Sequence, residues 1–169
     1  IDRIDTLRQG DHKYVVIIDY KSGRKQLDIS QIFTGLELQL LTYMFVALLN
    51  IGGDAIPAAV LYCYVRNDRV SLEYRVSDED KKKLYESKGK LTGFYLDDGQ
   101  VMQQLDTSMQ GFSDFLNLRL KKDGTLSDAS HTLYNEAGWS HLLDWAARQI
   151  EDIAGHIGDG DISIHPVLL

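Results

Sequence analysis

The fold of this chain is decided by one stretch, Tyr14-Val15-Val16-Ile17-Ile18-Asp19-Tyr20-Lys21-Ser22-Gly23. Its first five residues predict a strand buried on both faces, and they lead directly into Asp-x-Lys. Side chains alternate along a strand, so Asp19 and Lys21 point to one side while Tyr20 points away. Unpaired buried charge is costly, and these two charges therefore indicate a function. A carboxylate that can hold a cation, beside an ammonium that can reach a phosphate or a water, suggests metal-assisted hydrolysis of a phosphodiester.

Length and composition predict a single domain, 1–169, that can bury a substantial core. The chain has 169 residues, of which 44% are hydrophobic. Its longest apolar stretch, near 36–49, is interrupted by Glu37, Gln39 and Thr42, so we expect no membrane span and no membrane partner. The chain begins at Ile1 within a strand-like pattern, which predicts an excised piece of a larger protein.

Charge and cysteine content limit the classes of function. The net charge of −7 argues against a surface that is basic throughout, but it leaves room for a local basic channel that binds nucleic acid. The single cysteine, Cys63, excludes an internal disulfide and predicts a reducing, cytoplasmic compartment. Its place in a predicted strand favours a buried structural thiol. The histidines are scattered, so no zinc site is expected at His12, His131, His141, His156 or His165.

The first third of the chain predicts an α/β core. Strands are expected at 1–7 and 14–21, joined in a hairpin by the turn Gln9-Gly10-Asp11-His12. A helix over 31–50, capped by Asp28 or Ser30 and stopped by Gly52-Gly53, leads to a strand at 58–65, just after Pro57. The order strand, strand, helix, strand makes the helix a crossover, which predicts a mixed sheet flanked by helices.

The remaining patterns predict smaller elements around this core. We expect strands at 70–76 and 91–96, a charged helix or loop at 77–87, a short helix at 99–106, a peripheral hairpin over 117–125, a helix at 135–156 and an apolar tail at 160–169. The lysines Lys81, Lys82, Lys83, Lys121 and Lys122 can contact phosphates, although a solvated surface explains them as well.

The hairpin register predicts a partner for Asp19. A loop from Gln9 to His12 pairs Arg8 with Lys13, and counting back places Asp2 directly opposite Asp19. Directly paired residues share a face, and two carboxylates that close repel unless a cation lies between them. Asp5 faces the other way in a regular strand, but a shift of one residue would exchange the two candidates.

A second polar pair lies on the predicted helix. Gln39 and Tyr43 are four residues apart and are therefore neighbours on one helical face. If that face looks toward the strand ends, an amide and a phenol line the site beside Asp19. The alternative is a partly exposed Gln and a Tyr that extends its hydroxyl to water.

Together these residues resemble the motif series of RecB-like nucleases in the PD-(D/E)xK superfamily, which implies a restriction-endonuclease-like core. The chain is similar nearly end to end to the C-terminal nuclease domain of AddB/RexB-type subunits of bacterial ATP-dependent helicase–deoxyribonucleases. The similarity is carried by Ile1-Asp2-Arg3-Ile4-Asp5, Ile18-Asp19-Tyr20-Lys21-Ser22, Gly35 through Tyr43, Pro57 through Tyr62, Arg119 through Gly124 and Gly160-Asp161-Ile162.

The resemblance implies a role for each motif residue. Asp2 and Asp19, with the main-chain carbonyl of Tyr20, would coordinate Mg²⁺, with Mn²⁺ as a substitute. Lys21 would orient the attacking water and stabilise charge on the phosphate. Gln39 and Tyr43 would position the nucleic-acid backbone or the Lys21 region, and Ser22 would touch a phosphate. These residues form the expected catalytic and nucleic-acid-binding set.

The resemblance also implies a setting for the domain. An exodeoxyribonuclease with an AddA-type helicase partner would act on DNA ends during double-strand break repair and recombination; the alternative is an inactive nuclease-like scaffold that clamps DNA. The family carries a [4Fe-4S] cluster on four cysteines, which Cys63 alone cannot form, and related nucleases have a metal ligand on an upstream helix that falls outside this sequence.

Overall fold

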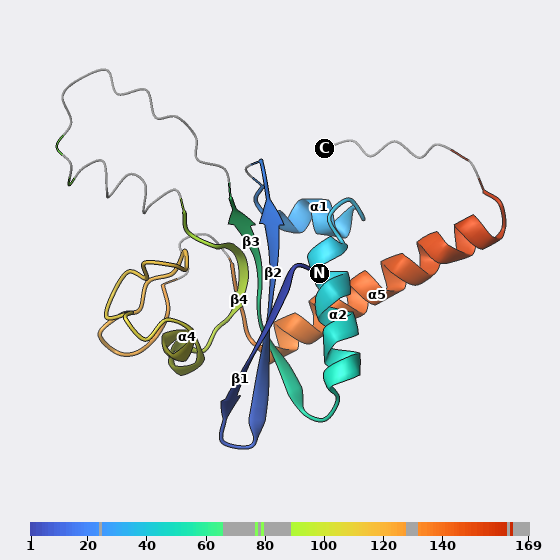
Figure 1. Cartoon of the computed structure of the whole chain (residues 1–169). Helices are drawn as coiled ribbons and strands as arrows, with labels where there is room; N and C mark the ends of the chain where they lie inside the picture. The colour runs from blue at the N-terminus through green and yellow to red at the C-terminus, as the bar shows by residue number, and fades with distance from the viewer. Residues whose placement is uncertain are drawn as a thin grey trace.

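The computed structural model describes residues 1–23, 25–65, 77, 79, 89–127, 132–161 and 163. Five strands form one sheet in the order β1-β2-β3-β4-β5. In Figure 1, α2 and α5 cross one another over the same side of β2 and β3, while α4 lies away from them beside β4. The elements are β1 (Arg3–Gln9), β2 (His12–Lys21), α1 (Ile29–Phe33), α2 (Gln39–Ile51), β3 (Ala55–Tyr64), β4 (Thr92–Leu96), α4 (Gly99–Leu105), β5 (Leu133–Tyr134) and α5 (Glu136–Gly158).

The predicted α/β fold with a mixed sheet is confirmed. β1 and β2 are antiparallel, β2 and β3 are parallel, β3 and β4 are antiparallel, and β4 and β5 are parallel. The helical segment between β2 and β3 is the expected crossover. All residues of β2 from Tyr14 to Asp19 are buried, because helices cover one face and the α4 side covers the other.

The hairpin register is also confirmed. Arg8 pairs with Lys13 and Arg3 pairs with Ile18, so one further step places Asp2 opposite Asp19. The turn is shorter than expected because Gln9 and His12 still pair, which leaves only Gly10 and Asp11 outside the ladder. Gly10 takes a positive φ of 60°, as tight two-residue hairpin turns require.

The third strand begins earlier than predicted. β3 starts at Ala55, so Pro57 lies inside the strand and not before it. Proline has no N–H to donate to the ladder, and the pairing accommodates this with a register shift: Val15 pairs with Pro57 but Val16 pairs with Ala59. At Pro57 the strand is paired with β2 alone, because pairing with β4 begins only at Ala59, so the missing N–H leaves no gap on the β4 side.

The prediction of one continuous helix over 31–50 is wrong. α1 is capped by Asp28, as expected, but ends at Phe33, and α2 begins only at Gln39. Gly35 takes a φ of 77° and reverses the backbone, a conformation that residues with a Cβ adopt at a cost. Gly52 ends α2 as predicted, with a φ of 66°. The break lets both Ile32 and Leu40 reach the core.

The later elements follow their predicted ranges. β4, α4 and α5 lie within one or two residues of the expected segments 91–96, 99–106 and 135–156. The peripheral hairpin is reduced to an antiparallel bridge between Leu120 and Leu126. The expected strand 70–76, nearly all of segment 77–87 with Lys81, Lys82 and Lys83, and most of the tail 160–169 lie outside the described residues.

Two further expectations concern the core and the membrane. Cys63 lies on β3 as predicted and packs against the core, but it is partly and not completely buried; this burial raises the pKa of its thiol. Across the described ranges, no helix is both long enough and apolar enough to cross a membrane.

Candidate active site

The candidate site lies at the edge of the sheet where the parallel strands β2 and β3 end. Asp19 is 4% exposed, although it is a carboxylate, and it pairs with Tyr62 of β3. Lys21 Nζ lies 2.5 Å from Asp19 Oδ2, so the two charges of Asp-x-Lys meet directly. This contact lacks hydrogen-bond geometry, and Asp19 Oδ2 accepts no hydrogen bond from another group. A buried carboxylate oxygen is therefore held beside an ammonium with coordination capacity to spare.

Asp2 reaches the same edge from β1. Its Oδ2 accepts a hydrogen bond of 2.8 Å from the backbone N–H of Tyr20. Asp5 is engaged elsewhere: it forms an exposed ion pair with Arg3, at 2.8 Å between Arg3 Nη2 and Asp5 Oδ2. The geometry therefore brings Asp2, and not Asp5, to the end of β2.

Lys21, Gln39 and Tyr43 form one hydrogen-bonded chain. Lys21 Nζ donates to Gln39 Oε1 at 3.0 Å, and Gln39 Nε2 donates to Tyr43 Oη at 2.9 Å. Because α2 starts at Gln39, the amide stands at the helix N-terminus, where it holds the ammonium of Lys21 in addition to Asp19. Of the two alternatives for this helical pair, the structure shows the one that faces the strand ends.

Three further side chains meet here that sequence reasoning missed. Tyr62 is 2% exposed, and both Lys21 Nζ and Lys25 Nζ lie 5.4 Å from its ring centroid. Glu37, 7% exposed, pairs with Lys25 at 3.0 Å through Oε1, while its Oε2 accepts no hydrogen bond. Burial, followed by the Glu37 carboxylate, raises the pKa of Tyr62 to about 12, so its hydroxyl stays protonated and can donate. Sequence reasoning assigned no partner to Glu37, because Lys25 lies in the loop after β2 and only the folded chain brings the two together.

The ion pair between Lys25 and Glu37 predicts a large stability effect. Lys25→Met leaves the Glu37 carboxylate buried and unpaired, and we expect the free energy of unfolding to fall by about 3–5 kcal/mol in denaturant titrations. The double variant Lys25→Met/Glu37→Gln removes the uncompensated charge and should recover most of that loss. Equal stability of the single and double variants would show that water already neutralises the penalty.

The remaining predicted positions are peripheral. Ser22 is exposed just beyond the end of β2 and makes no hydrogen bond within the described part of the chain. Tyr20 points away from the site and is 42% exposed, as alternation requires, while its main chain is held by Asp2. Lys121 and Lys122 are exposed beyond the sheet, in the turn near α4.

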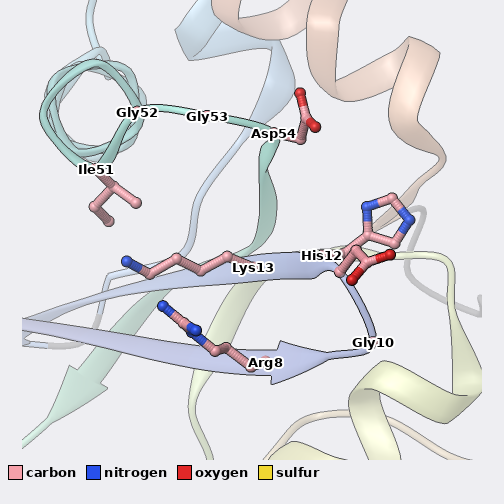
Figure 2. Close-up of a pocket in the computed structure, with 9 residues that line it drawn as sticks. Arg8, Gly10, His12, Lys13, Ile51, Gly52, Gly53 and Asp54 are labelled. Atoms are coloured by element: carbon pink, nitrogen blue, oxygen red, sulfur yellow. The ribbon is translucent and has the colours of Figure 1, made fainter.

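A separate cavity lies at the opposite end of the sheet and is not the predicted site. It occupies about 390 Å³ between the β1–β2 turn and the loop after α2. Figure 2 shows the side chains of Arg8 and Lys13 lying alongside one another and extending toward the Ile51 end of α2. This arrangement places two cations near the negative end of the α2 dipole, a position that stabilises them.

The donors at the candidate site fit a hard divalent cation. Among the described residues, no three His, Cys, Asp or Glu side chains gather closely enough to hold a metal by themselves. The set at the strand ends consists of two carboxylates, Asp2 and Asp19, with a main-chain carbonyl at Tyr20. Oxygen ligation of this kind suits Mg²⁺, which keeps several waters, and Asp19 Oδ2 is a buried carboxylate oxygen whose contact is the Lys21 ammonium.

This sheet and this edge of polar side chains define a nuclease fold. The family model for the PD-(D/E)XK nuclease superfamily matches residues 1–166, and the chain belongs to that superfamily. The resemblance expected from the motifs is confirmed.

Among curated proteins, the chain is similar to proteins described as a subunit of ATP-dependent helicase/deoxyribonuclease, of the AddB type. It is 31% identical over 170 residues to the protein from Clostridium kluyveri, 33% over 169 residues to that from a Thermoanaerobacter species and 35% over 173 residues to that from Bacillus mycoides. Each match covers 98% of this chain but 15% of the relative, so the chain spans a small part of their length.

Proposed function

We propose that this domain hydrolyses phosphodiester bonds of DNA with Mg²⁺, or with Mn²⁺ in its place. The observation that carries the proposal is the contact of Asp19 with Lys21 at the buried end of β2, with Asp2 brought to the same edge. A divalent cation bound there lowers the pKa of a bound water and neutralises charge on the phosphate. A purely structural domain gains nothing from paired carboxylates beside a lysine, which argues against the inactive scaffold.

Residues of this chain can orient the phosphate and the groups that react with it. Lys21, fixed between Asp19 and Gln39, presents its ammonium where negative charge grows on the phosphate oxygens. The N-terminus of α2 has no side-chain cap, so the positive end of the helix dipole faces the same place. Tyr43 holds the amide of Gln39. Water adds to phosphorus, the ester oxygen leaves, and the products are a phosphate monoester and an alcohol.

The relatives favour a setting within a helicase–nuclease. We infer that the domain is the single nuclease module of a larger subunit, which works beside an AddA-type partner on DNA ends during double-strand break repair and recombination. The similarity to proteins described as a helicase/deoxyribonuclease subunit supports this setting. Exonucleolytic cleavage is the mode we expect for a module that acts behind a helicase.

A matched pair of variants, one just before β1 and one on it, tests the proposal. Asp2→Asn should lower Mg²⁺-dependent cleavage of labelled DNA more than about 100-fold and raise the Mn²⁺ concentration needed for half-maximal binding. Asp5→Asn makes the same change on the other face of the strand and should stay within twofold of the parent, because Asp5 is paired with Arg3. Loss of metal binding in the Asp5 variant alone would reverse the ligand assignment.

A further inference from the structure

Two phenylalanines are exposed on a braced loop between α4 and the bridge at Leu120. Phe112 is 70% exposed and Phe115 is 64% exposed, although neither lies on a helix or strand. Exposed aromatic rings on an otherwise polar surface mark interaction sites when the backbone that carries them is fixed. The proposed phosphodiester chemistry uses neither ring.

The loop is held by a buried carboxylate. Asp106, 4% exposed, accepts hydrogen bonds from Ser108 N at 3.1 Å and from Ser113 Oγ at 2.5 Å. Ser113 Oγ in turn accepts from the backbone N–H of Phe115 at 3.2 Å and of Leu116 at 2.8 Å. Ser113 therefore anchors the backbone of Phe115 and lies next to Phe112, so little conformational entropy remains to be lost when a ligand binds.

Two cations stand over the Phe112 ring. Arg119 Cζ lies 4.9 Å and Lys90 Nζ 5.9 Å from its centroid. Lys90 also donates to the Ser113 carbonyl at 2.5 Å, which leaves the ammonium with further donors. Aromatic rings combined with cations are the composition of surfaces that bind single-stranded nucleic acid, where bases stack on the rings and the cations meet phosphates. A partner polypeptide with an acidic, aromatic surface could also bind such a loop. Single-stranded DNA explains the surface better, because the loop lies along the edge of the sheet that carries Asp19.

The pairing of the strands places this surface in line with the candidate site. Asp19 pairs with Tyr62, and Tyr62 pairs with Thr92, so Thr92 lies two strand spacings from Asp19, about 10 Å. Leu91 then bridges to Leu116, and its N–H donates to the Phe115 carbonyl at 2.8 Å. The loop is one further spacing away, about 15 Å from Asp19 in total. At roughly 3.4 Å per nucleotide, that span corresponds to about four nucleotides of a stacked strand.

We infer that Phe112 and Phe115, with Lys90 and Arg119, form a base-stacking platform that holds single-stranded DNA about four nucleotides from the scissile phosphate. The inference rests on the proposed function and assigns its substrate: a single strand that leaves the cleavage site along the ends of β3 and β4. The platform sets affinity for strands long enough to reach it and plays no part in the chemical step.

Strand length makes the test specific. In the complete protein, without divalent cations, Phe112→Ala/Phe115→Ala should weaken binding of a labelled strand of about 12 nucleotides by fivefold or more. Binding of a competitor of about three nucleotides should not change, because it cannot span the distance. With Mg²⁺, KM for the longer strand should rise while kcat is kept. Phe112→Leu/Phe115→Leu, which keeps the apolar volume but removes the aromatic faces, should show the same loss, and Phe112→Tyr/Phe115→Tyr should restore affinity.

The controls separate the alternatives. Leu49→Ala changes a side chain that is 68% exposed on α2 and should leave both affinities unchanged. Unchanged binding of the longer strand by the double Ala variant overturns the platform, as does an equal loss for both lengths. Loss of association with another polypeptide alone would assign the surface to a protein partner and also overturn it. A different result would show that the proposed function is wrong while the platform is right. The parent protein would then bind the strand in a length-dependent way yet not cleave it with Mg²⁺.

Discussion

On the proposed function, Asp19→Asn should lower cleavage of DNA by at least about 1,000-fold, because the substitution removes the buried negative charge that the proposed cation needs and that holds Lys21. In the helicase–nuclease proposed as the setting of this domain, ATP-driven unwinding should persist. The measurement is cleavage of labelled DNA ends at saturating Mg²⁺ alongside an unwinding assay in the same preparation. Normal cleavage of the strand assigned to this nuclease would remove Asp19 from the mechanism.

Stability should move differently from activity in this variant. Asp19 is 4% exposed and its Oδ2 lies 2.5 Å from Lys21 Nζ, so a neutral amide removes the charge partner of an ammonium that still keeps Gln39 and is 27% exposed. We expect the unfolding midpoint to fall modestly, because Gln39 and solvent still stabilise Lys21. Asp98→Ala is the contrasting control: Asp98 caps α4 by accepting from Gln100 and Val101, and its loss should cost about 1 kcal/mol without affecting cleavage.

Gly93→Ala should unfold or severely destabilise the domain, by about 4 kcal/mol or more. A Cβ on Gly93 would lie 2.0 Å from the Val60 carbonyl oxygen and 3.1 Å from Leu61 Cα, both backbone atoms of β3. Val60 is fully buried and paired with both β2 and β4, so the strand has no room to yield. Gly93 also has a φ of 157°, which residues with a Cβ rarely adopt.

The loss of stability in Gly93→Ala can be measured by chemical denaturation, with a glycine that has free space around its Cα as the control. At Gly155 in α5 an added Cβ meets nothing within 4 Å, and alanine is the better helix former. Gly155→Ala should therefore raise the free energy of unfolding by up to about 1 kcal/mol. If the two alanine variants proved equally stable, the close approach of β4 to β3 would be wrong.

Local sequence patterns were sufficient to predict the structure of segments whose conformation depends mainly on their own residues. The apolar run before Asp19 specified a buried strand because five consecutive β-favouring residues leave no polar face. The turn at Gly10 set the register, and register alone selected Asp2 over Asp5 for the end of β2. The spacing of Gln39 and Tyr43 fixed their common face, and their hydrogen bond follows from it. The nuclease family was visible in this motif order for the same reason.

The tertiary structure decided what the chain brings together across breaks and bulges. After the break at Gly35, Glu37 pairs with Lys25, and α2 starts at Gln39, whose side chain accepts from Lys21. The hydrophobic periodicity of the sequence does not predict the break at Gly35, because a continuous helix would bury the same leucines of α2. The pairing of Asp19 with Tyr62, and of Tyr62 with Thr92, likewise depends on which strands lie side by side.

The sequence by itself thus determined the strand that carries Asp19 and Lys21, its hairpin partner and the class of chemistry, because these depend on alternation and spacing within short segments. Only the tertiary structure placed Tyr62, Lys25 and Glu37 around that pair and brought the phenylalanine loop to the same edge of the sheet. Contacts between residues far apart in the chain are fixed by how strands pair and helices pack, and those choices depend on the burial of the whole core.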